Sequence, residues 1–179
     1  MEASPRTAPW RGATFCCTLE VLGLAIWVGG LVAILGSVIP EVFNLGMEAG
    51  GRLLTKVFVR YNQLILLAIG LIVTVGIYRV WLVIRHGAAE ASFSRWEGSL
   101  LAIMILIQLV LMVVLVPESV VRQEAAFAAQ GEVARKAAHD AFFQSHKVVR
   151  SLYVANFVFG AGVIAVKIRQ WLGIGRNWS

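Results

Sequence analysis

Four long apolar stretches alternate along the chain with shorter segments rich in polar and charged residues. The stretches are approximately Val21–Ile39, Leu64–Ile84, Ser99–Pro117 and Ser151–Gly173. The hydrocarbon core of a bilayer is about 30 Å thick, and a helix needs about 20 residues to cross it. The pattern therefore predicts an all-α integral membrane protein built as a four-helix bundle.

The domain organisation follows from the same pattern. Inside lipid every backbone polar group needs an internal partner, and the alternating pattern of a membrane barrel is absent, so the stretches are expected to be helices. The first stretch is longer than the apolar part of a signal peptide, so we expect it to be retained as a span. We expect a tail over residues 1–12 and one transmembrane domain over residues 13–175, with spans at about 18–40, 60–85, 98–118 and 150–173.

The three connections differ in character. Residues 40–60 are expected to form a short link, and residues 86–97 a polar turn that begins at His86-Gly87. Residues 118–150 are rich in alanine, the best helix former, and contain Gly131 as the natural turn. We therefore expect the third and fourth helices to continue beyond the membrane as a hairpin.

Composition and charge narrow the class further. A mean hydropathy of +0.77 with 59% hydrophobic residues excludes an ordinary soluble domain. The net charge of +6 arises from Lys and Arg residues that cluster at the ends of the spans, where they meet lipid headgroups. The expected partners are thus membrane lipids and either other membrane subunits or further copies of this chain, and nucleic acid is not expected.

Four spans place both termini on one side of the membrane. Lys and Arg divide equally between the two sides, but the C-terminal segment is purely basic, which favours cytoplasmic termini in a bacterial inner membrane. Tryptophan marks the depth of the terminal side, because indoles prefer the headgroup interface. The tryptophans expected there are Trp10, Trp81, Trp96, Trp171 and Trp178; Trp27 instead lies deep in the first span.

Four polar or charged residues lie within or at the start of spans. Glu20 is a candidate for a proton or cation role, because an ionisable group inside a membrane is costly, although a small shift of the helix would place it at the interface. Gln108 and Asn156 are expected to form hydrogen bonds between helices. Arg79 lies within two turns of a span end and is expected to extend to the interface rather than form a buried ion pair.

Small residues on the first span could let another helix approach closely. Gly29, Ala33 and Ser37 form such a row, and Ala161 and Ala165 form a shorter one on the fourth span. The sequence leaves open whether these rows pack within the bundle or between protomers.

Two histidines are candidate ligands of a metal ion or a haem. His139 and His146 are two helical turns apart and share a face, but neither lies in an apolar stretch as a haem ligand between spans would. Only Asp140 is nearby, whereas zinc usually takes four ligands. We predict no metal site and no cofactor; a lipid, quinone or pigment held by shape alone stays open.

Several short motifs resemble those of a bacterial four-span domain of unknown function related to eukaryotic transmembrane protein 205. That family has Trp-x-Gly-Gly in its first helix, Pro-x-x-Phe at the exit, Ala-Gly, and Phe-x-x-Tyr entering the second helix. The matching residues, in order, are Trp27, Gly29, Gly30, Pro40, Phe43, Ala49, Gly50, Phe58 and Tyr61.

The resemblance extends over about residues 20–170 and departs from the family near the last span. The family carries Phe-x-x-His followed by Ser three residues on and Asn seven on, whereas here Ser151 and Asn156 lie five and ten residues beyond His146. The resemblance implies a four-span bundle and no settled activity. A more general likeness to copper-resistance D-type membrane proteins would imply metal handling.

Two functional hypotheses follow. The first is a non-catalytic accessory or scaffold subunit of a larger membrane complex, such as an energy-transducing one. The alternative is a small transporter or metal-tolerance protein in which Glu20, Gln108, Asn156 and His146 line one path. An enzyme acting on a lipid-soluble substrate stays open but has no positive signal, since no phosphate-binding loop, nucleophile elbow or paired-carboxylate site is present.

Overall fold

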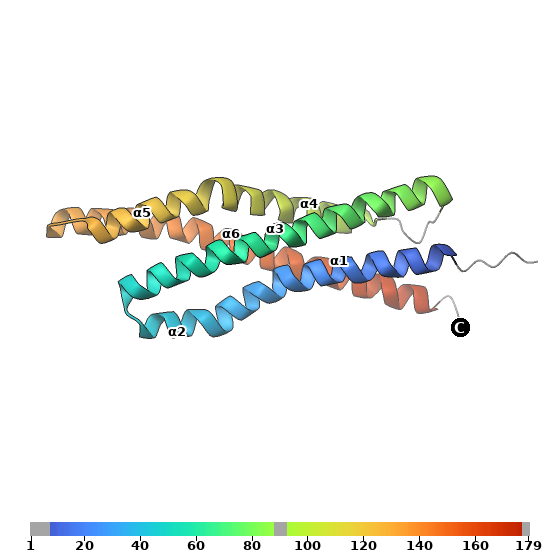
Figure 1. The fold of residues 1–179 in the computed structure, drawn as a ribbon, viewed down its shortest axis with the longest axis horizontal. Helices are drawn as coiled ribbons and strands as arrows, with labels where there is room; N and C mark the ends of the chain where they lie inside the picture. Colours follow the sequence, from blue (N-terminus) through green and yellow to red (C-terminus); the bar gives the residue numbers. More distant parts are fainter. Residues whose placement is uncertain (1–7, 88–92, 177–179) are drawn as a thin grey trace, which may run out of the picture.

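A computed structural model describes residues 8–87 and 93–176 and shows four long helices packed as an elongated bundle (Figure 1). The first helix comprises α1 (Ala8–Ala33), a π-helical turn η1 (Ile34–Val38) and α2 (Ile39–Asn44); the second is α3 (Met47–His86). The third comprises α4 (Arg95–Val110), a π-helical turn η3 (Leu111–Leu115) and α5 (Val116–Ala128); the fourth is α6 (Glu132–Arg176). The start of α1 and the end of α6 lie at the same end of the bundle (Figure 1).

All four helices are long and apolar enough to cross a membrane. The qualifying segments are Thr14–Val42, Glu48–Arg85, Arg95–Ala128 and Glu132–Gly173, and they contain 18-residue stretches with mean hydropathies of 2.3, 2.2, 3.0 and 1.7. The large side chains that point away from the bundle are mainly apolar, as a lipid-facing surface requires. The expectation of an all-α integral membrane bundle is confirmed.

The first and third helices share one irregularity. In each, a π-helical turn ends two residues before a proline, Pro40 in α2 and Pro117 in α5. Proline has no N–H to donate to the preceding turn, so the carbonyls there must find other partners, and the wider turn accommodates this.

The first connection is much shorter than the expected link over residues 40–60, and that prediction was wrong. Helix α2 ends at Asn44, Gly46 turns the chain with a φ of +81°, and α3 begins at Met47. Gly50 and Gly51, which suggested a loop, lie inside α3. A Cβ on Gly50 would collide with the carbonyl oxygen of Val42, and one on Gly51 would lie 2.7 Å from Nε2 of Gln123. Because these glycines have no side chain, they allow the neighbouring helices to approach α3 closely.

The second hairpin has the form expected from its alanine content. Helices α5 and α6 are joined by a short turn at Gly131, which has a φ of +85°. This hairpin reaches past the turn between α2 and α3 (Figure 1).

At the other end of the bundle, α1 begins at Ala8, so part of the expected N-terminal tail is helical, while residues 1–7 lie outside the described part of the chain.

The motif residues Trp27, Gly30 and Tyr61 close the first hairpin. The Tyr61 hydroxyl donates a hydrogen bond of 2.5 Å to the backbone oxygen of Trp27. Gly30 leaves room for the Tyr61 ring, since a Cβ there would lie 2.5 Å from Cε2 of that ring. Trp27 itself is fully buried among the core residues.

Candidate functional site

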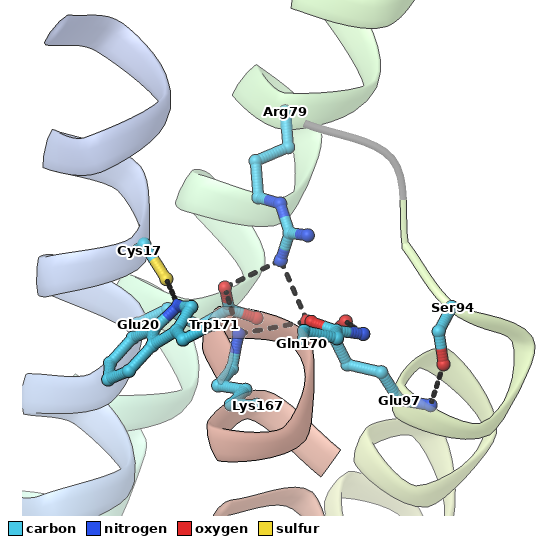
Figure 2. Close-up of polar contacts among 8 residues, drawn as sticks. All are labelled: Cys17, Glu20, Arg79, Ser94, Glu97, Lys167, Gln170 and Trp171. Atoms are coloured by element: carbon cyan, nitrogen blue, oxygen red, sulfur yellow. Dashed lines mark hydrogen bonds and ion pairs between the residues drawn. The ribbon is translucent and has the colours of Figure 1, made fainter. Parts of the chain in front are cut away.

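Four charged side chains, one from each of the four long helices, meet inside the bundle. Nη1 of Arg79 (α3) lies 2.7 Å from Oε2 of Glu20 (α1) and 2.8 Å from Oε1 of Glu97 (α4). Nζ of Lys167 (α6) lies 2.7 Å and 2.9 Å from the same two oxygens. The four side chains thus form a closed ring of alternating charge, called here the charged quartet (Figure 2).

The quartet is supported by neighbouring polar and aromatic groups. Gln170 donates to the second oxygen of Glu97 at 3.1 Å, and the hydroxyl of Ser94 caps α4 by accepting from the backbone N–H of Glu97 (Figure 2). The guanidinium of Arg79 also lies over the ring of Phe93, with Cζ 3.9 Å from the ring centroid. Oε1 of Glu20 is buried and has no hydrogen-bond partner among the described residues.

The burial of the quartet is its main electrostatic feature. The side chains of Glu20 and Glu97 are 0% exposed, and those of Lys167 and Arg79 are 3% and 9% exposed. Charges removed from water require close partners, and loss of one partner leaves the other charge uncompensated. The ring arrangement gives each charge two opposite partners.

The quartet lies at the level of the tryptophans that are expected at one membrane interface. Three tryptophans lie within four positions of a quartet residue in the sequence, and all three are exposed on the outside of the bundle: Trp81, Trp96 and Trp171. Of the other tryptophans assigned to this belt, the Trp10 side chain and Trp178 lie outside the described residues. The charges therefore lie inside the bundle near the end where α1 begins and α6 ends (Figure 1).

A second polar cluster lies deeper in the bundle. Asn156 (α6) donates to Gln108 (α4) at 3.1 Å, and Gln108 donates to Asn62 (α3) at 3.0 Å. The Tyr153 hydroxyl donates to the same oxygen of Asn62 at 3.0 Å. We call these four residues the amide cluster. Eleven residues of helix separate Glu97 from Gln108, which places the two clusters roughly 16 Å apart at 1.5 Å per residue.

The first and third helices repeat each other in the positions they bury. Five buried residues of α1 and η1 have a buried counterpart 77 positions later (97 − 20) in α4 and η3. The pairs are Glu20 and Glu97, Leu24 and Leu101, Trp27 and Met104, Leu31 and Gln108, and Ile34 and Leu111. The π-helical turns also correspond, and each glutamate precedes a Pro-Glu pair by 20 residues (40 − 20 and 117 − 97).

The second and fourth helices repeat each other in the same way. Buried positions of α3 recur 88 positions later (167 − 79) in α6. The pairs are Tyr61 and Val149, Ile65 and Tyr153, Ala68 and Asn156, Ile72 and Gly160, Val75 and Val163, and Arg79 and Lys167. The chain is therefore two similar halves, a first half of α1–α3 and a second half of α4–α6.

The quartet lies where the two halves meet. Each half supplies one acid from its first helix and one base from its second, at corresponding positions. Corresponding residues are 77 positions apart in the first and third helices and 88 positions apart in the second and fourth helices. The difference arises because the hairpin of the second half is 11 residues longer (88 − 77). That extension has no counterpart in the first half.

The polar residues singled out from the sequence do not share one path. Glu20 lies in the quartet, Gln108 and Asn156 lie in the amide cluster, and the interhelical hydrogen bonds expected of the two amides are present. His146 lies in neither cluster and stacks on Phe142, with ring centroids 5.6 Å apart.

The remaining motif positions are structural or peripheral. Gly29 faces outward with open space around it, and Pro40 follows the π-helical turn of the first helix. The side chain of Phe43 lies outside the described part of the structure.

The prediction for Arg79 was wrong, and three further interior residues were missed. Arg79 turns inward to the two glutamates instead of extending to the interface, because opposite charges are available at its own depth. Glu97 was expected in a polar turn, and Lys167 and Asn62 were not singled out from the sequence. The matching 20-residue spacing from each glutamate to its Pro-Glu pair was the signal that could have identified Glu97.

The histidines and cysteines lie apart from both clusters. His139 stacks near Phe143, with centroids 6.3 Å apart, and among the described residues no three His, Cys, Asp or Glu side chains are grouped to hold a metal ion. Cys16 is buried, and the sulfur of Cys17 accepts a hydrogen bond of 3.1 Å from the Trp171 indole (Figure 2).

Comparison with known proteins gives one match. A family model described as a domain of unknown function (DUF4149) matches residues 22–128, which is more than half of the chain. Arg79 and Glu97 lie inside the matched region, while Glu20 and Lys167 lie outside it. No curated protein and no solved structure matches the chain.

Proposed function

Because the chain belongs to the family described as a domain of unknown function (DUF4149), we propose a role from its geometry: it is a non-catalytic accessory or scaffold subunit of a larger membrane complex. The host complex is an energy-transducing one, and the partners are other membrane subunits together with lipid. The proposed location is a bacterial inner membrane with both termini cytoplasmic. We also propose that this family is related to eukaryotic transmembrane protein 205.

One observation carries the scaffold proposal. The second half repeats the first except for its hairpin, which is 11 residues longer and extends past the α2–α3 turn (Figure 1). The quartet and the amide cluster both lie within the repeated part, so the extension is not needed to bury either of them. Val133 at its turn is 86% exposed and Val121 on α5 is 70% exposed. Exposed apolar residues on a projecting element favour contact with another protein.

The arrangement of polar side chains inside the bundle also supports the scaffold proposal. The side chains of the quartet and of the amide cluster bond mainly to one another, in two separate groups. A transporter would be expected to gather its polar side chains along one path, whereas a scaffold uses them to join helices.

The test compares matched substitutions at the two hairpin turns. Val133→Glu alters the long hairpin, and Leu45→Glu, at a residue that is 53% exposed, alters the short one. Each variant would be purified from native membranes in mild detergent, and co-eluting proteins identified by mass spectrometry. We expect stoichiometric partners with the wild type and with Leu45→Glu, and their loss with Val133→Glu. A lone wild-type monomer or homodimer would overturn the scaffold proposal.

Transport of a small solute is the second candidate. The observation that favours it is the two-half organisation with charged residues at the junction. Membrane transporters are commonly built from two repeats, with the substrate site between them. Uptake into proteoliposomes, followed by Glu20→Gln, tests this candidate independently of any partner.

A further inference from the structure

The charge pattern of the quartet matches the division of the protein into halves. Within the first half Glu20 contacts Arg79 at 2.7 Å, and within the second half Glu97 contacts Lys167 at 2.9 Å. The other two contacts, Glu20 to Lys167 at 2.7 Å and Glu97 to Arg79 at 2.8 Å, join the halves. Each half therefore contributes an acid and a base that already pair with each other.

This arrangement lets the halves separate locally without leaving a lone charge. If they part at this end of the bundle, the two contacts between halves are lost and the two contacts within halves remain. The cost of an uncompensated buried charge is thus avoided. The helix packing is consistent with such movement, because α1 packs closely on α3, and α6 on α4 and α5, while α1 and α6 approach each other less extensively.

We propose that the quartet is a binding site for a small zwitterion that enters between the two halves. The ammonium group of the ligand takes the place of one base beside the carboxylates of Glu20 and Glu97. Its carboxylate or phosphate takes the place of one acid beside Arg79 and Lys167. The four side chains and the two charged groups of the ligand then form one larger ring of alternating charge. The net charge of the site is unchanged.

The unpartnered oxygen of Glu20 supports this assignment. Oε1 is buried and accepts no hydrogen bond from the described residues, while Oε2 contacts both Arg79 and Lys167. A carboxylate oxygen can accept an N–H from an ammonium group. A ligand with only one sign of charge would leave an unbalanced charge in a site shielded from water, so the site discriminates against simple cations and anions.

Two kinds of ligand carry one positive and one negative group of this type. One is a free amino acid, and the other is the headgroup of an ethanolamine phospholipid, which is available at the depth of Trp96 and Trp171. This inference rests on the second candidate function, transport, and is independent of the scaffold proposal.

Binding would be measured on the purified full-length protein in lipid nanodiscs by isothermal titration calorimetry. Glycine is the probe, with glycinamide as the singly positive analogue and acetate as the singly negative one. We expect glycine to bind about tenfold or more tightly than either analogue, and Glu20→Gln to weaken glycine binding about tenfold, while Glu41→Gln, at an exposed position of α2, leaves it unchanged. Equal binding of glycinamide or acetate, or glycine binding unaffected by Glu20→Gln, would overturn the proposal.

The lipid composition of the nanodiscs separates the two sources. Equal glycine affinity with and without phosphatidylethanolamine supports a free solute. Competition by phosphatidylethanolamine, together with its retention by the purified protein, supports the headgroup. Absence of glycine binding together with absence of phosphatidylethanolamine retention overturns the zwitterion site.

A cross-link tests the movement without changing a charged residue. The indole of Trp171 on α6 reaches the sulfur of Cys17 on α1, so Trp171→Cys places a second thiol opposite a native one. A bifunctional methanethiosulfonate reagent with a spacer as long as an indole would then join the two halves at this end through two reducible mixed disulfides. We expect the joined protein to lose glycine binding and to regain it after reduction; unchanged binding would refute entry between the halves.

Measurement of glycine uptake into proteoliposomes distinguishes the binding site from a transport activity. Binding without uptake rejects transport and retains the site. Uptake of glycinamide or acetate without glycine binding retains transport and rejects the zwitterion site.

Discussion

Glu20 and Glu97 occupy equivalent positions in two halves of one chain, and each contacts both Arg79 and Lys167. The two glutamates lie in helices whose buried residues correspond at a constant spacing. Their meeting joins the four long helices through one set of ion pairs.

Removal of a charge from the quartet should destabilise the bundle strongly. Arg79→Gln leaves two buried carboxylates with one base fewer, and we expect a loss of about 3–5 kcal/mol. Arg85→Gln, at an exposed position on the same helix, is the matched control and should change stability little. Unfolding in detergent followed by circular dichroism measures both. Similar effects for the two variants would contradict a stabilising role for the quartet.

Exchange of the two bases should be tolerated far better than removal of either. The double variant Arg79→Lys with Lys167→Arg keeps one base in each half, and the corresponding positions of these residues predict a stability much closer to wild type than that of Arg79→Gln. The same unfolding measurement applies. A double variant as unstable as Arg79→Gln would show that the two positions are not interchangeable.

The adjacent glycines of the Trp-x-Gly-Gly motif should respond oppositely to alanine. Gly30→Ala places a Cβ 2.5 Å from the Tyr61 ring, so we expect a loss of about 1–3 kcal/mol. Gly29→Ala meets nothing within 4 Å and should be neutral or stabilising by up to about 1 kcal/mol. Unfolding midpoints of the two variants give the comparison. Equal destabilisation would mean that the close approach of α1 and α3 at Gly30 does not limit side-chain size.

The amide cluster should show graded losses. Tyr153→Phe removes one hydrogen bond to Asn62, and a cost near 0.6 kcal/mol is expected, whereas Gln108→Leu removes two and leaves the Asn62 and Asn156 amides short of partners. Gln63→Leu, at an exposed position beside Asn62, is the control. A larger loss for Tyr153→Phe than for Gln108→Leu would reverse the expected order.

The adjacent cysteines should differ in reactivity. Cys16 is 2% exposed, while Cys17 is partly exposed and contacts Trp171. Because thiol reagents need access, a small maleimide should label Cys16→Ser but not Cys17→Ser in the native state, and both after unfolding. Mass spectrometry of the labelled protein gives the result, and native labelling of Cys17→Ser would contradict the burial of Cys16.

The membrane class and the helical hairpin could be derived from the sequence because each depends on local properties. Span length and hydropathy act residue by residue, and the alanine content with Gly131 specifies two helices and a turn. The first connection was mispredicted for the opposite reason. Gly50 and Gly51 favour a loop locally, but contacts with Val42 and Gln123 decide that they belong to a helix.

By itself, the sequence determined that four apolar helices are long enough to cross a membrane, and that a few polar residues lie among the apolar ones. Only the tertiary structure decided which of those polar residues meet. Glu20 and Lys167 are far apart in the chain, and their contact depends on which face each helix turns inward. A buried charge is stable only beside an opposite charge. The partners of Arg79 are Glu20 and Glu97, and the packing of the two halves against each other brings the second of these into contact.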